Sequence, residues 1–175
     1  MKKTISFILS CVLLLSLCAC SSEPSLVGTS PAGATETPTT ISDKTFSIGD
    51  SVELNDVVIK FVDLSVSKGS KYFKPADGNV FLACEFEIAN NSSEDLSVSS
   101  VLSFEAYCDD YTCEYSISAL SANQDKKQLD GTVASGKKMK GIVAYEVPSD
   151  WKELEVHYTP DILSSSEIIF VATNS

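Results

Sequence analysis

From Thr45 onward, apolar residues recur at every second position, and this spacing limits the possible folds more than any other feature of the chain. Between Val80 and Ile88 the apolar side chains would point to one face of a strand, whereas Glu85 and Glu87 would point to the other. We expect the first face to be core and the second to face water. β-Branched and aromatic residues dominate these runs, as is typical of strands.

Six further runs with this pattern predict about seven strands in all. They span residues 57–66, 101–107, 112–117, 140–147, 154–158 and 168–172. Turn-forming residues separate the runs, as in Asp77-Gly78-Asn79. Only the stretch 118–129 has room for a short helix. Strands of this number and spacing predict an all-β fold for residues 45–175, an immunoglobulin-like antiparallel β-sandwich.

The N-terminus has the pattern of a signal peptide, because Lys2 and Lys3 precede an apolar run over residues 5–17. A membrane-spanning helix needs about 20 apolar residues, so this run is too short to be one. We therefore expect residues 1–19 to be removed as a signal peptide.

The apolar run ends in Leu17-Cys18-Ala19-Cys20, which resembles the lipobox of bacterial lipoproteins. The resemblance implies that the thiol of Cys20 is joined to diacylglycerol and anchors the chain at the extracellular face of the cell membrane. An ordinary secretory signal is the alternative. Residues 20–44 are rich in Ser, Thr, Pro and Gly, which predicts a disordered linker that gives the domain reach from the membrane.

The chain is acidic, with 13 lysines, no arginine, 24 acidic residues and a net charge of −11. Loss of Lys2 and Lys3 with the signal peptide lowers the charge to −13. A nucleic-acid partner requires clustered basic side chains, so this composition argues against one.

Three cysteines remain besides Cys20 and those of the signal peptide. Cys84 falls on the inward face of its predicted strand, where free cysteine packs as a small apolar residue. Cys108 and Cys113 bracket a predicted four-residue hairpin tip, and they could form a disulfide or remain reduced.

Few residues could bind a metal or catalyse a reaction. His157 is the single histidine, which is too few for a copper site and gives weak support to a zinc site with the cysteines. Carboxylate and amide oxygens cluster near two predicted turns: Asp109, Asp110 and Glu114 near one, Asp77 and Asn79 near the other. No twelve-residue calcium-loop pattern organises them. No nucleophile and base are paired in a catalytic motif, so we expect no enzyme, no cofactor and no resident metal.

Five features follow one another along the chain: the segments 78–82 and 87–94, the aromatic residues Phe104, Tyr107 and Tyr115, and the segments 136–141 and 145–148. In this order they resemble the telokin-like, immunoglobulin-like domain of unknown function 4352. Such domains commonly follow a lipoprotein leader and a low-complexity linker in Gram-positive bacteria, and they supply no catalytic residue to transfer. The hairpin at 108–113 departs from the Asp and Gly turn that is common in them.

Three aromatic residues fall in predicted loops: Tyr111 at the hairpin tip, and Tyr72 and Phe73 in a lysine-rich loop over residues 68–74. Loops at the end of a sandwich are where such folds usually bind partners. We therefore expect a non-enzymatic interaction module with a protein or cell-wall partner. A small-ligand or calcium sensor is the alternative, and a degenerate hydrolase has no support in the sequence.

Overall fold

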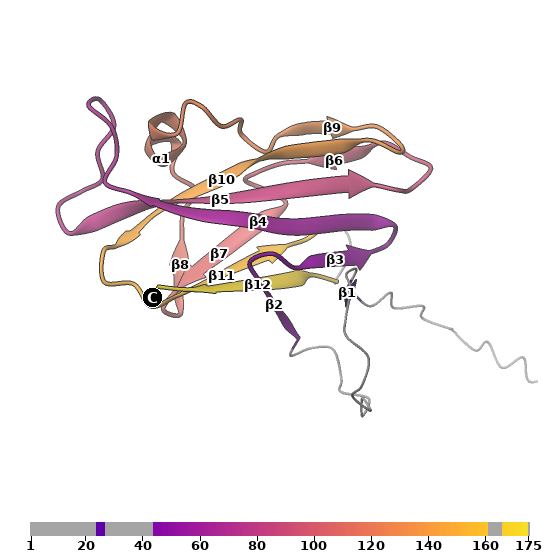
Figure 1. Cartoon of the computed structure of the whole chain (residues 1–175), viewed down its shortest axis with the longest axis horizontal. Helices are drawn as coiled ribbons and strands as arrows, with labels where there is room; N and C mark the ends of the chain where they lie inside the picture. Colours follow the sequence, from indigo (N-terminus) through magenta and orange to yellow (C-terminus); the bar gives the residue numbers. More distant parts are fainter. Residues whose placement is uncertain (1–23, 27–43, 161–165, 175) are drawn as a thin grey trace, which may run out of the picture.

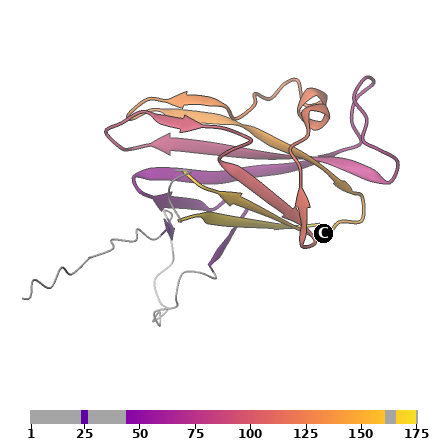
Figure 2. The same ribbon diagram turned by 180° about the vertical axis from the view of Figure 1, so that it is seen from behind.

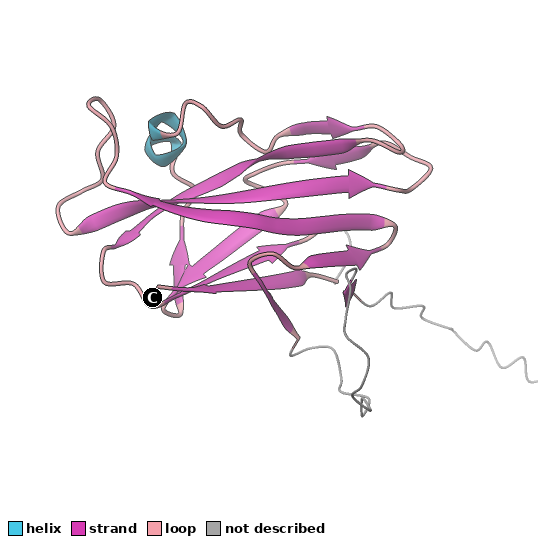
Figure 3. Cartoon of the chain, viewed as in Figure 1, coloured by secondary structure: helices cyan, strands magenta, loops and turns pink. Residues whose placement is uncertain are grey.

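The computed structural model describes residues 24–26, 44–160 and 166–174, so the signal peptide, Cys20 and most of the linker lie outside the described residues. The described part is built almost entirely of strands, with one short helix (Figure 3). The elements are β1 (Ser25–Leu26), β2 (Thr45–Ser47), β3 (Ser51–Leu54), β4 (Val57–Ser67), β5 (Asn79–Asn90), β6 (Leu96–Val98), β7 (Phe104–Cys108), β8 (Tyr111–Cys113), α1 (Ile117–Ala122), β9 (Gly131–Val133), β10 (Lys138–Pro148), β11 (Glu153–Tyr158) and β12 (Ile168–Thr173).

Two five-stranded sheets form the two layers of a β-sandwich (Figure 1). The first has the order β1-β3-β4-β5-β10, and the second has the order β2-β12-β11-β7-β8. All neighbouring strands are antiparallel except β2 and β12, which are parallel. β6 and β9 form a separate two-stranded sheet. The predicted antiparallel β-sandwich is confirmed.

The core lies between the two sheets and is dominated by phenylalanine rings. Phe86 of β5 stacks on Phe61 of β4, with ring centroids 4.6 Å apart. Across the sandwich it contacts Phe104 of β7 and Phe170 of β12, at 5.3 and 5.5 Å. These rings are almost fully buried, as the alternation in the sequence predicted for this face of β5.

The prediction that the other face of β5 meets water is wrong for much of its length. Phe81 is fully buried there and forms a second, smaller cluster with Ala119 of α1 and Ala144 of β10. The helix covers this face because Ser116 caps its N-terminus and donates its backbone N–H to Ala144 O at 2.8 Å. The face is therefore apolar where α1 lies over it (Figure 2).

Glu85 also differs from the prediction, because its side chain is only 17% exposed. Its carboxylate forms ion pairs with Lys126 and Lys140, each at 3.1 Å. Desolvation by burial raises the pKa of Glu85, but hydrogen bonds from the two ammonium groups outweigh it and hold the pKa below its ordinary value. This carboxylate therefore joins the first sheet to the segment that follows α1.

All seven predicted strands are present, but two of them are shorter than predicted. Residues 101–103 belong to a turn, in which Ser103 N–H donates to Ser99 O at 2.9 Å, so β7 begins only at Phe104. β8 ends at Cys113 because the chain leaves the second sheet there and reaches α1. Five further short strands were not predicted, since two to four residues are too few to show a period.

Candidate functional site

Three connections meet at one end of the sandwich, on the left in Figure 1. The loop between β4 and β5 adjoins the turn between β10 and β11, because Ser149 N–H donates to Gly78 O at 2.8 Å. That turn adjoins the β7–β8 hairpin, because the carboxylate of Asp109 accepts hydrogen bonds from the N–H groups of Lys152 and Glu153, at 3.0 and 2.9 Å. We call residues 68–78, 109–111 and 148–152 the loop end.

The lysine-rich loop is held in one conformation by its own residues. Gly69 has a positive φ of 84°, and a side chain there would collide with the carbonyl of Phe73. Ser70 N–H donates to Phe73 O at 2.7 Å, and the Ser70 hydroxyl accepts from Phe73 N–H at 3.2 Å. The loop is thus a compact turn that fixes the residues between these positions.

Tyr72 and Phe73, predicted together as partner-binding residues, have different environments. Phe73 is half-buried and packs against the small cluster beneath α1. Tyr72 is 78% exposed, and the ammonium group of Lys71 lies 5.4 Å from the centre of its ring. Phe73 therefore attaches the loop to the sandwich, whereas Tyr72 is free to contact a partner.

The β7–β8 hairpin has a two-residue tip, so the predicted four-residue tip is wrong. Asp109 and Asp110 both have positive φ, 49° and 68°. Two successive residues of this kind match the twist of paired strands and allow the tightest hairpin. Tyr111 pairs with Cys108 at the start of β8, and its side chain is 79% exposed.

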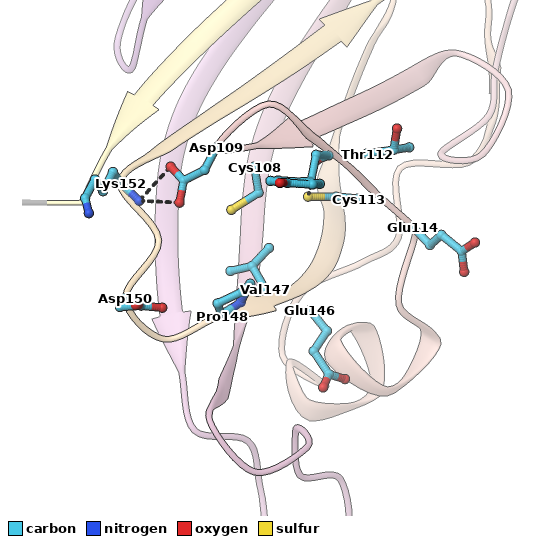
Figure 4. A pocket seen from close by; sticks show the side chains of 11 residues that line it. Cys108, Asp109, Thr112, Cys113, Glu114, Glu146, Val147, Pro148, Asp150 and Lys152 are labelled. Carbon is cyan, nitrogen blue, oxygen red and sulfur yellow. Dashed lines mark hydrogen bonds between the residues drawn. The ribbon is translucent and has the colours of Figure 1, made fainter.

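A cavity of about 320 Å³ lies between the hairpin and the β10–β11 turn (Figure 4). Two carboxylates that border it support the surrounding loops. Asp109 holds the β10–β11 turn, and Glu146 accepts hydrogen bonds from Ala76 N–H and the Asn79 side chain at 2.8 and 3.0 Å. Figure 4 shows the carboxylates of Glu114 and Glu146 pointing away from the thiols of Cys108 and Cys113.

The oxygen ligands considered for calcium do not converge. Across the described residues, no three His, Cys, Asp or Glu side chains are placed to share a metal ion. Both oxygens of Asp109 accept backbone N–H bonds, and Asn79 binds Glu146. Two of the groups considered for zinc lie elsewhere. The side chain of His157 lies between the carboxylates of Glu155 and Glu167, at 3.2 and 3.1 Å. Cys84 is fully buried in the main core.

Cys108 and Cys113 lie diagonally across the hairpin, since Cys113 pairs with Ala106 and Cys108 with Tyr111. Both are free thiols in the structure. Burial, together with the neighbouring Cys108, raises the pKa of Cys113 to about 12, and burial also raises the pKa of Cys108. The disulfide stays a prediction, because the geometry places the thiols near each other without joining them.

We expect the Cys113 thiol to react slowly with iodoacetamide at pH 7.5 in the native protein, because only the thiolate is a nucleophile and the raised pKa keeps the thiol protonated. The alkylation rate should rise about tenfold per pH unit up to pH 10, as the thiolate fraction does. Mass spectrometry of the modified peptide measures this rate. Fast alkylation at pH 7.5 would contradict the prediction, and alkylation only after reduction would establish the disulfide.

Sequence reasoning missed the residues that position the two tyrosines. The hydrogen bonds from Ala76 to Glu146 and from Lys152 to Asp109 join positions 70 and 43 residues apart. No local pattern marks such contacts. Gly69 carried the one available signal, since a glycine between Lys68 and Ser70 in a loop is a typical site for positive φ.

These features define a class of protein: a two-layer antiparallel β-sandwich with exposed tyrosines on ordered loops at one end. The chain belongs to the family described as Domain of unknown function (DUF4352), whose sequence model matches residues 46–168. This confirms the resemblance seen in the sequence. A search of curated proteins gives no match.

Two solved structures from Bacillus subtilis are similar to this chain. One is the presumed lipoprotein ycdA, which is 21% identical over 68% of this chain, with a TM-score of 0.57. This chain matches only 37% of the length of ycdA. The other is the yjhA protein, which is 14% identical over 72% of this chain and 98% of its own, with a TM-score of 0.52. At these identities the likeness shows the fold alone.

No helix within the described ranges is long and apolar enough to span a membrane.

Proposed function

We propose that this chain is a non-enzymatic lipoprotein, anchored through Cys20 to the extracellular face of the cell membrane, whose loop end binds a protein or cell-wall partner. The lipobox-like segment before Cys20 supports the anchor, as does the fold shared with the presumed lipoprotein ycdA. No catalytic motif is recognisable in the sequence, and no metal-binding cluster occurs in the described residues.

The observation that carries the proposal is the exposure of Tyr72 and Tyr111 on two ordered loops at the same end of the sandwich. Each ring is almost four-fifths exposed. Tyrosine offers a large contact area and one hydroxyl at a low cost in side-chain entropy. Because the loops are already held by Gly69 and Asp109, little further ordering is needed when a partner binds.

Charge indicates how a partner would be oriented on this surface. Lys68, Lys71 and Lys74 are exposed around Tyr72, whereas the hairpin beside Tyr111 carries two aspartates. A partner that spans both loops would place an acidic group near Tyr72 and a basic or neutral group near the hairpin. Such complementarity chiefly speeds association and fixes orientation.

Photo-crosslinking in intact cells tests the proposal. A photoreactive amino acid at position 72 or 111 should trap the same partner, which mass spectrometry would identify. Position 102 is the matched control, because Leu102 is 68% exposed but precedes the start of β7, at the far end of that strand from the hairpin. Equal adducts at all three positions, or none at 72 and 111, would contradict binding by the loop end.

With the partner identified, Tyr72→Ala and Tyr111→Ala should each weaken binding at least about tenfold, because central aromatic residues commonly contribute more than about 1.4 kcal/mol to an interface. Leu102→Ala should leave the dissociation constant unchanged. Titration calorimetry with the purified, unlipidated Cys20→Ser protein would measure all three. An unchanged constant in both tyrosine variants would exclude these side chains from the interface.

A further inference from the structure

The predicted linker is interrupted by a strand. Ser25 and Leu26 form β1, which pairs antiparallel with Glu53 and Val52 of β3 at the edge of the first sheet. β2 begins at Thr45 and pairs with β12, so the chain is held by the sandwich both before and after residues 27–43. Residues 27–43 connect β1 to β2, which are both paired with strands of the sandwich. They therefore do not lengthen the connection between Cys20 and the domain.

The direction of β1 fixes the end of the sandwich at which the anchor enters. Ser25, the residue nearer to Cys20, pairs with Glu53, and Leu26 pairs with Val52. The chain thus arrives from the side of the β3–β4 turn at Asn55 and reaches β3 near its C-terminal end.

That turn and the loop end lie at opposite ends of β4 (Figure 1). β4 starts at Val57, directly after the turn, and ends at Ser67, directly before the lysine-rich loop. Its 11 residues, at about 3.3 Å each, correspond to a separation of about 35 Å. Tyr72 is therefore carried at the end of the domain that is remote from the point of attachment.

We propose that the lipid anchor holds the domain close to the bilayer by its β1–β3 edge, with the loop end facing away from the membrane. This inference rests on the lipidation of Cys20 in the proposed function. Residues 21–24 then form the whole tether and span at most about 14 Å, whereas residues 21–44 fully extended would reach about 80 Å. The partner of Tyr72 and Tyr111 accordingly lies on the wall side of the domain, beyond the membrane surface.

The edges of the first sheet fit this arrangement. β1 covers the outer side of β3, and on β10 the segment 127–129 exchanges hydrogen bonds with Ile142 at 2.8 and 3.1 Å. Gly141 permits that approach, since a Cβ there would lie 2.8 Å from Lys127 O. Both edges of the first sheet are occupied where these segments pair. A partner that binds by adding a strand therefore has less access to these edges than to the loop end.

Energy transfer from a fluorophore at Tyr72→Cys to an acceptor dye in phosphatidylglycerol vesicles tests the inference on the full lipidated protein. Insertion of ten Gly and Ser residues after Ser22 should move the fluorophore outward by about 10 Å, as expected for a flexible chain. Deletion of ten residues from 30–39 should leave the distance unchanged. A decrease of about 6 Å on deletion would show that the whole linker is the tether and would overturn the inference.

A second pair of variants shows whether β1 is responsible. Ser25→Pro with Leu26→Pro removes both backbone N–H groups of β1 and should make the distance sensitive to the same deletion. If the distance stays insensitive, the pairing is not what shortens the tether. Failure of the wild-type protein to float with vesicles, or a mass without diacylglycerol at Cys20, would contradict the lipid anchor of the proposed function. In that case, protection of either the Ser25 or the Leu26 amide from hydrogen exchange in the Cys20→Ser protein still decides whether β1 pairs with β3, since alternate residues of an antiparallel pair are hydrogen-bonded.

Discussion

Phe86→Ala is expected to lower the free energy of unfolding by about 4 kcal/mol, the largest loss of stability predicted for a single substitution here. Phe86 is fully buried and lies at the centre of the aromatic core. Its ring contacts Phe61 in its own sheet and Phe104 and Phe170 in the facing sheet, all within 5.5 Å between centroids. Alanine would leave a cavity between the two layers, where neither rigid sheet can close on it.

Urea denaturation of the unlipidated Cys20→Ser protein would measure this change, and the melting temperature should fall by about 15 °C. The control is Phe86→Leu, which keeps most of the volume and should cost about 1–2 kcal/mol. If Phe86→Ala loses less than about 1.5 kcal/mol, the two sheets do not depend on this contact. A changed denaturant slope would indicate that the denatured or native state also altered.

Asn90→Ala is expected to lower the free energy of unfolding by about 3 kcal/mol, because it removes four hydrogen bonds of one buried side chain at once. The side chain of Asn90 is fully buried at the end of β5. Its amide nitrogen donates to the carbonyls of Glu94 and Val133, at 2.7 and 2.8 Å. Its amide oxygen accepts from the N–H and the hydroxyl of Ser92, at 3.1 and 2.7 Å.

The neighbouring Asn91 provides a matched control, because its side chain is exposed. Asn91→Ala should change stability by less than about 0.5 kcal/mol. Asn90→Asp should be as damaging as Asn90→Ala, since a carboxylate has no N–H to donate to Glu94 and Val133. Equal stabilities of the Asn90→Ala and Asn91→Ala proteins would show that this turn does not depend on the buried amide.

Asn90 and Asn91 illustrate how far the sequence predicts this site. Turn-forming residues in the segment 90–93 correctly placed the end of β5. The sequence does not distinguish the buried asparagine from the exposed one, because one partner of the Asn90 side chain is Val133, which lies 43 residues away. The same limit applies to Tyr72 and Phe73, which are adjacent in the sequence but differ in burial once α1 folds over β5.

The sequence alone determined the class of fold and placed Tyr72 and Tyr111 in loops. Alternation with a period of two reflects the geometry of a single strand, and turn-forming residues act through their own backbone, so neither requires knowledge of distant residues. The tertiary structure decided the rest. It gathered Tyr72 and Tyr111 at one end, buried the second face of β5 beneath α1, and joined Ser25 to β3 within a segment predicted to be linker. Each of these depends on contacts between segments far apart in the chain, whose pairing is set by packing and hydrogen bonding in the folded state rather than by local composition.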